Sequence, residues 1–116
     1  MDIINVLTEV TRRINQIGIP YVIGGSVATV INGCSSIKPN DIDVILKNAV
    51  DVEKVAFLFE DFLSESQAIE STDMSNWIST LSQPTINFED PFHNRWTFAR
   101  LLFKGIKVEV GNIQPT

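Results

Sequence analysis

The sequence has 116 residues, of which 44% are hydrophobic and 20% are charged. This length suits one domain that buries roughly 65% of its extended-chain surface, and the composition excludes disordered, collagen-like, coiled-coil and disulfide-stapled proteins. Fourteen acidic against nine basic residues give a net charge of −5. Because binding of a long nucleic acid requires an excess of cationic side chains, we expect no long DNA or RNA partner, although one bound nucleotide is compatible with this charge.

The cellular compartment is indicated by three features. Cys34 is the single cysteine, which excludes an intrachain disulfide and a thiolate zinc cluster. The first residues include Asp2 where a signal peptide would carry basic residues, and no apolar run approaches the roughly 18 residues that span a bilayer. We therefore expect a cytoplasmic protein with no membrane partner.

The first elements follow from hydrophobic spacing. Apolar residues recur every three or four positions over residues 2–17, which predicts an amphipathic helix ended by the glycine that follows. Residues 21–23 predict a short buried strand that runs into a turn at Gly24-Gly25. Ser26 is the predicted N-cap of a second helix over residues 26–31.

Residues 34–40 are predicted as a loop, and residues 41–46 as a strand rich in β-branched side chains. Asp51 is the predicted N-cap of a third helix over residues 52–63. The resulting alternation of helices and strands is typical of an α/β domain.

The second half of the chain begins with a polar stretch over residues 64–95, which we interpret as a lid or insertion with a short helix near 74–82. Residues 96–103 and 106–113 then predict a hairpin around a two-residue turn. The chain is predicted to be one domain over residues 1–116. We expect an α/β (α+β) fold, with a mixed, twisted sheet of about four or five strands and helices mainly on one face.

Gly24, Gly25 and Ser26 lie where a predicted strand passes into a helix. Glycines let the backbone approach a ligand closely, and a helix N-terminus offers free N–H groups to an anion. The residues therefore suit a phosphate-binding turn, while an ordinary turn remains the alternative.

Asp41 and Asp43 are separated by one residue on a predicted strand, so both carboxylates lie on the same face, about 7 Å apart at Cα. Like charges at this spacing are unfavourable unless a cation or solvent separates them. A bridging Mg²⁺ or Mn²⁺ is one explanation, because the donors are all oxygen. A solvated strand end is the other.

Glu109 lies on the last predicted strand between Val108 and Val110, so it projects from the opposite face to both valines. If this strand lies beside residues 41–46, Glu109 adds a third carboxylate to the pair. Otherwise it is an ordinary exposed glutamate.

This combination of a Gly-Gly-Ser turn, an acid-x-acid pair and a later strand carboxylate resembles the nucleotidyltransferase superfold, the catalytic core type of DNA polymerase beta. Residues 21–28 (YVIGGSVA) and 40–44 (NDIDV) look like the small bacterial and archaeal members. Those include the minimal nucleotidyltransferases of toxin–antitoxin pairs, the abortive-infection type, and the aminoglycoside and lincosamide adenylyltransferases. The resemblance covers residues 18–47 well and 106–111 more loosely.

The resemblance implies catalytic and metal-binding roles for Asp41, Asp43 and Glu109, with Mg²⁺ or Mn²⁺ as the cofactor. It implies that the triphosphate of an NTP, expected to be ATP, binds at the turn. Relatives often carry an arginine and a threonine in the loop before the first aspartate. Here Lys38 is the basic residue of that loop and the remaining candidate for a phosphate contact. The predicted nucleotide-binding residues are thus Gly24, Gly25, Ser26 and Lys38.

The resemblance implies transfer of a nucleoside monophosphate, expected to be AMP, to a hydroxyl of a small molecule or protein. Larger members carry a helical domain for the acceptor, so a partner protein or homodimer is expected to complete the site. One alternative is a catalytically inactive nucleotidyltransferase-fold protein with an antitoxin-like or regulatory role. Another is a structural interaction domain whose acids are merely solvated.

Overall fold

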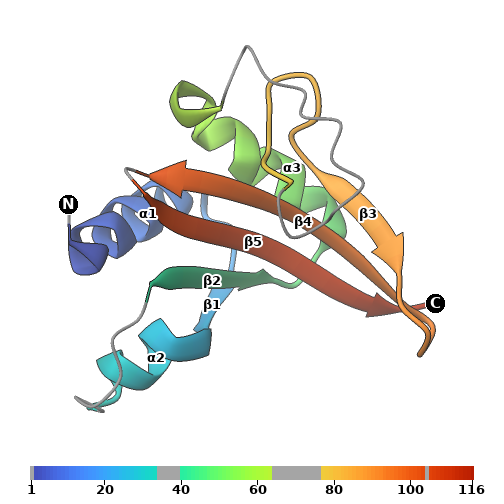
Figure 1. Cartoon of the computed structure of the whole chain (residues 1–116), viewed down its shortest axis with the longest axis horizontal. Helices are drawn as coiled ribbons and strands as arrows, with labels where there is room; N and C mark the ends of the chain where they lie inside the picture. Colours follow the sequence, from blue (N-terminus) through green and yellow to red (C-terminus); the bar gives the residue numbers. More distant parts are fainter. Residues whose placement is uncertain (1, 34–39, 64–76, 104) are drawn as a thin grey trace.

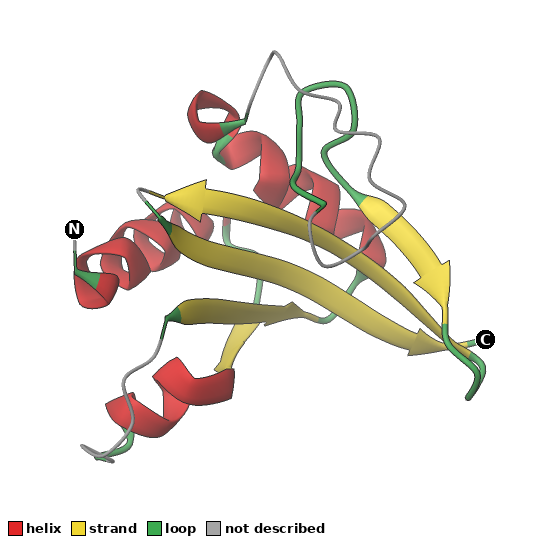
Figure 2. Cartoon of the chain, viewed as in Figure 1, coloured by secondary structure: helices red, strands yellow, loops and turns green. Residues whose placement is uncertain are grey.

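A computed structural model describes residues 2–33, 40–63, 77–103 and 105–116. Five strands form one mixed sheet in the order β1-β2-β5-β4-β3 (Figure 1, Figure 2). This confirms the expected class of fold and the strand number. The elements are α1 (Ile3–Ile17), β1 (Tyr21–Gly24), α2 (Gly25–Ile31), β2 (Asp41–Leu46), α3 (Ala49–Leu58), a 3₁₀ turn η1 (Glu60–Phe62), β3 (Ile86–Glu89), β4 (Asn94–Phe103) and β5 (Ile106–Pro115).

The strand directions place the last strand in the middle of the sheet. β1 is antiparallel to β2, and β2 is parallel to β5. β4 is antiparallel to β5, and β3 is antiparallel to β4. The predicted hairpin is confirmed and is longer than expected, because β4 and β5 each contain ten residues. Neither residues 34–39 nor residues 64–76 lie within the described part of the chain.

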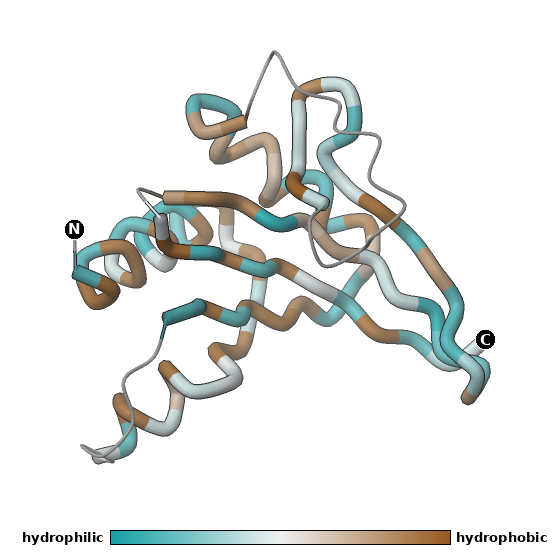
Figure 3. Tube along the Cα trace, viewed as in Figure 1, coloured by the Kyte–Doolittle hydropathy of each residue, from teal (hydrophilic) through white to brown (hydrophobic). Residues whose placement is uncertain are grey.

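The core lies between the sheet and the helices α1 and α3, which lie on the same side of it (Figure 1). Hydrophilic and hydrophobic residues alternate along much of β2 and β5 (Figure 3). Because side chains alternate along a strand, the buried residues of both strands share the face toward the helices. The opposite face of these strands carries the charged residues. The fully buried side chains of the two strands are Ile42, Val44, Leu46, Val108 and Val110.

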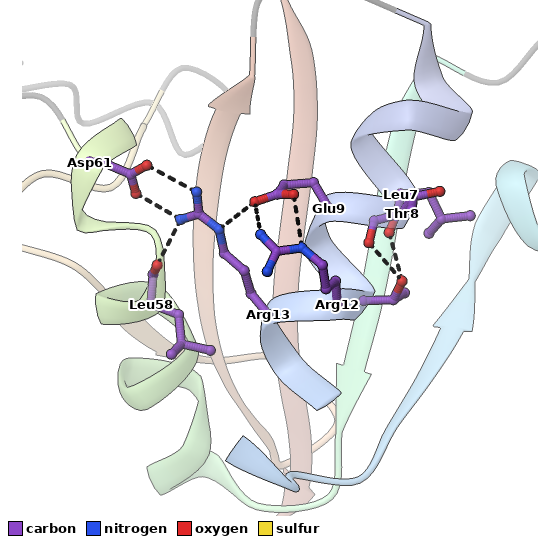
Figure 4. A network of polar contacts seen from close by, with 8 residues as sticks. Leu7, Thr8, Glu9, Arg12, Arg13, Leu58 and Asp61 are labelled. Atoms are coloured by element: carbon purple, nitrogen blue, oxygen red, sulfur yellow. Dashed lines mark hydrogen bonds and ion pairs between the residues drawn. The ribbon is translucent and has the colours of Figure 1, made fainter. Parts of the chain in front are cut away.

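Arg13 joins α1 to the end of α3 (Figure 4). Its guanidinium donates to both carboxylate oxygens of Asp61, at 2.8 and 3.0 Å, and to the Leu58 carbonyl oxygen at 2.9 Å. It also donates to Glu9 at 2.8 Å and lies 5.0 Å from the centre of the Phe59 ring. The helices are thereby fixed to each other on one side of the sheet.

The helix termini differ from the sequence predictions. Gly24, not Ser26, is the N-cap of α2, because the helix begins at Gly25, two residues earlier than a helix capped by Ser26 would. Asn48, not Asp51, is the N-cap of α3, because β2 ends at residue 46 and two residues make the connection. Asp51 lies in the first turn of that helix.

The predicted third helix also ends early. α3 ends at Leu58, and the following residues form a 3₁₀ turn in which the Phe62 N–H donates to the Phe59 carbonyl at 2.8 Å. An α-helix would direct that N–H to Leu58, but the Leu58 carbonyl accepts from Arg13 instead. The contact with α1 therefore replaces the last helical turn.

Two further predictions are wrong. β1 was expected to be buried, yet it is an edge strand and its Val22 side chain is 62% exposed. Residues 77–82, part of the predicted short helix, are not helical. There, the Ser79 N–H donates to the Arg100 carbonyl of β4 at 2.9 Å, so the segment lies along the sheet. The strand β3 that follows was not predicted.

Candidate active site

Three carboxylates lie together on the face of the sheet opposite α1 and α3. Asp43 of β2 is paired directly with Glu109 of the parallel strand β5, and Asp41 is paired with Lys107. Since Ile42 of β2 is fully buried, its two neighbours point to the open face. The condition on which a third carboxylate at Glu109 depended is met, because the last strand lies beside residues 41–46.

The electrostatics of Asp43 reflect this arrangement. Partial burial raises the pKa of Asp43 above its ordinary value, and the negative charges of Glu109 and Asp41 raise it further. The site therefore concentrates negative charge that a bound cation would compensate. Among the described residues, however, no three His, Cys, Asp or Glu side chains are arranged as a ready metal-binding group.

The Gly-Gly-Ser turn lies on the other side of Asp43. Gly24 of β1 is its antiparallel partner, and Gly25 has a φ of 67°, in the left-handed region that favours glycine. A Cβ at Gly25 would collide with the carboxylate of Asp43. Ser26 follows in the first turn of α2. The structure thus brings the predicted phosphate-binding turn against Asp43, whereas Lys38 lies outside the described residues.

Arg100 is a site residue that the sequence reading missed. It is paired with Glu109 across β4 and β5, and its Nε lies 3.3 Å from a Glu109 carboxylate oxygen. The guanidinium also donates to the Trp77 carbonyl oxygen at 2.9 Å and lies 5.4 Å from the centre of the Phe98 ring. The sequence did carry a signal for this pairing. In a hairpin with a two-residue turn at positions 104 and 105, residues equally far from the turn are opposite each other, so Arg100 is opposite Glu109.

A pocket of about 480 Å³ extends across the open face from these residues. Gly25 and Asp43 line it beside the turn, and Glu109 and Arg100 line its middle. Beyond them it is lined by aromatic and aliphatic side chains of β3, β4 and β5. Its volume lies within the range of pockets that bind small molecules.

The large aromatic residues and the single histidine differ in their distance from the site. Among the large aromatic residues, Trp77 is 5% exposed and Phe103 is 2% exposed, so both belong to the interior. Trp96 and Phe98 line the pocket. His93, the single histidine of the chain, is exposed at a turn and has a φ of 62°.

No family model and no curated protein matches the chain. Among solved structures, it is similar to a protein from Thermotoga maritima described as a "putative nucleotidyltransferase", with a TM-score of 0.67 and 20% sequence identity. The fold is nucleotidyltransferase-like. The match covers 95% of this chain and 56% of the other, so the chain spans little more than half the length of that protein. No helix in the described part of the chain is long and apolar enough to cross a membrane.

Proposed function

We propose that this protein is a metal-dependent nucleotidyltransferase that moves AMP from ATP to a hydroxyl group of a small molecule or protein. The observation that carries the proposal is the register of three strands. It places the Gly24-Gly25 turn, Asp43 and Glu109 in adjacent positions of one sheet face. The nucleotidyltransferase-like fold of the solved relative supports the same class.

Two carboxylates of the site suit a divalent cation, and the third would have to move to join them. Asp41 and Asp43 would hold Mg²⁺ or Mn²⁺, because their carboxylates share one face of β2 and these cations take oxygen ligands. Glu109 would become a third ligand if its carboxylate left the ion pair with Arg100 and bound the cation instead. When bound, the cation would neutralise charge on the phosphates and on the attacking and leaving oxygens.

The chain's own residues would orient the two substrates. Backbone N–H groups at Gly25 and Ser26 would hold the triphosphate close to Asp43, where any larger residue than glycine at position 25 would intrude. The acceptor oxygen would form a bond to the α-phosphorus while the bond from that phosphorus to the β-bridging oxygen breaks. Pyrophosphate would leave with the electron pair, and the hydroxyl proton would pass to Glu109. Most of the rate enhancement would come from positioning.

A second candidate is a regulatory or antitoxin-like protein that keeps the fold without turnover. The ion pair between Arg100 and Glu109 favours it, because the third carboxylate already has a cationic partner within the chain. Binding of nucleotide without transfer distinguishes this candidate from the enzyme.

Calorimetric titration of ATP into the protein tests the proposal, first with Mg²⁺ and then with EDTA. We expect binding that requires the metal and that falls at least tenfold in the Asp41→Asn/Asp43→Asn variant. The matched control is Glu53→Gln/Glu60→Gln, which removes two exposed carboxylates from α3 and the turn after it. No nucleotide binding by the folded wild-type protein contradicts the proposal.

Stability measurements show whether a loss of binding reflects loss of fold. Because the pKa of Asp43 is raised in the native state, the native state is more stable when this carboxyl is protonated. That part of the free energy of unfolding is lost as the pH rises through the raised pKa. At pH 7 the ionised carboxylate is therefore unfavourable, and Asp43→Asn is expected to raise the free energy of unfolding by about 0.5 kcal/mol. Near pH 3 the difference should disappear.

A further inference from the structure

The pocket has two chemically different halves. The half beside β1 and β2 contains the Gly25 backbone and the Asp43 carboxylate. The half beside β3 and β4 contains three aromatic side chains, Phe88, Trp96 and Phe98. Glu109 and Arg100 lie between the halves, on the adjacent strands β5 and β4.

The aromatic side chains are held in fixed orientations. The Trp96 indole N–H donates to the Asp90 carboxylate at 2.8 Å. Phe88 is its partner across β3 and β4, and the two rings are parallel within 6°, with centroids 5.7 Å apart. Phe98 meets Phe88 edge-on at 5.9 Å. Trp96 and Phe88 therefore present an ordered aromatic surface that lines the pocket, and Phe88 is 38% exposed.

Gly111 leaves this half of the pocket open. It lies on β5 between Ile45 of β2 and Phe98 of β4, and it lines the pocket. A Cβ added at Gly111 would be 3.6 Å from its nearest side-chain neighbour, the Phe98 Cβ, which is ordinary van der Waals contact. The fold thus tolerates alanine at this position, while a longer side chain would enter the pocket.

We propose that the aromatic half binds the acceptor, and that the acceptor is a planar aromatic compound bearing a hydroxyl group. This inference rests on the proposed function. The triphosphate would lie at the Gly25 side and the aromatic compound at the Phe88 side, so the carboxylates and the reacting atoms would lie between them. An aromatic hydroxyl ionises more readily than an aliphatic one. Arg100 lies beside Glu109, where the hydroxyl oxygen of the acceptor would approach.

The test is an NMR titration of 2-naphthol, followed through the indole N–H signals of Trp77 and Trp96, which a Trp77→Phe variant assigns. The matched compound is decahydro-2-naphthol, which has the same hydroxyl and no aromatic face. We expect 2-naphthol to shift the Trp96 signal and to bind at least tenfold more tightly than the saturated compound. Gly111→Leu should weaken binding at least tenfold, and Gly111→Ala less than threefold.

A separate titration with the non-hydrolysable analogue α,β-methylene-ATP and Mg²⁺ distinguishes the two proposals. Its failure to bind overturns the transferase proposal, whatever 2-naphthol does. The acceptor inference is supported if the analogue and 2-naphthol bind together and Gly111→Leu leaves the analogue's affinity unchanged. It is overturned if 2-naphthol does not shift the Trp96 signal, if the saturated compound binds equally well, or if the analogue displaces 2-naphthol, which would assign the aromatic half to the adenine ring.

Discussion

Gly25 and Gly18 have nearly the same left-handed backbone, with φ of 67° and 70°, but different surroundings. Nothing lies within 4 Å of a Cβ built at Gly18, whereas a Cβ at Gly25 would collide with Asp43. Gly18→Ala should therefore lower the free energy of unfolding by about 1 kcal/mol, the cost of the backbone conformation alone. Gly25→Ala should cost about 2–3 kcal/mol, and denaturant unfolding of both variants measures the difference.

The excess at Gly25 has a specific cause that a third variant checks. Asp43→Ala removes the carboxylate with which the new Cβ would collide. In that background, Gly25→Ala should therefore lower the free energy of unfolding by only as much as Gly18→Ala does in the wild type. Equal costs for Gly18→Ala and Gly25→Ala in the wild-type background would contradict the close approach of the turn to the carboxylate.

Single residues of the site differ in how far the sequence could reveal them. Asp41 and Asp43 were predictable because alternation along a strand fixes which side chains share a face. The place of Glu109 beside Asp43 depended on the pairing of β5 with β2, which is distant in sequence. Arg100 was overlooked because its significance comes only from pairing with Glu109. Gly25 was expected to approach a ligand, but its contact with Asp43 required the register of β1.

At the scale of elements, α1 and α3 depend on Arg13. Replacing Arg13 by methionine keeps much of the packing against the Phe59 ring and removes the bonds to Asp61, Glu9 and the Leu58 carbonyl. We expect a loss of about 1 kcal/mol at pH 7, mainly from the carbonyl bond, because solvent weakens the ion pairs. Thermal or denaturant unfolding checks this value.

The same variant should change the pH dependence of stability. Hydrogen bonds from Arg13 lower the pKa of Asp61, and those from Arg12 and Arg13 lower the pKa of Glu9. A lowered pKa means that the stabilisation is present above the ordinary values of 3.8 and 4.5, and it is lost as the pH falls below them. The difference between wild type and Arg13→Met should therefore shrink toward pH 3 without vanishing, because the bond to Leu58 remains. A pH-independent difference would contradict a role for the carboxylates.

Elements with strong local signals were predictable, and those defined by distant contacts were not. α1 has a continuous apolar face and β2 alternates, so both were found within a residue or two of their bounds. The end of α3 was missed because Arg13, which is far away in sequence, takes the Leu58 carbonyl. β3 was missed because its four residues gain their order from pairing with β4.

At the scale of the whole molecule, the sheet has one covered and one open face. Helices α1 and α3 cover the first (Figure 1). The carboxylates of Asp43 and Glu109 and the pocket occupy the second. The alternation that builds the core therefore also delivers the polar and aromatic residues to the site. Stability and binding should consequently depend on different residues of the same strand.

Ile42 and Ile45 of β2 allow this separation to be measured with one residue type. Ile42 is fully buried against the helices, whereas Ile45 is 47% exposed and lines the pocket. Ile42→Ala should lower the free energy of unfolding by about 3 kcal/mol, because it leaves a cavity in the core. Ile45→Ala should cost less than about 1 kcal/mol. Denaturant unfolding at several protein concentrations measures both changes. If the two variants lose the same free energy of unfolding and that loss depends on protein concentration, a second copy covers the open face in solution.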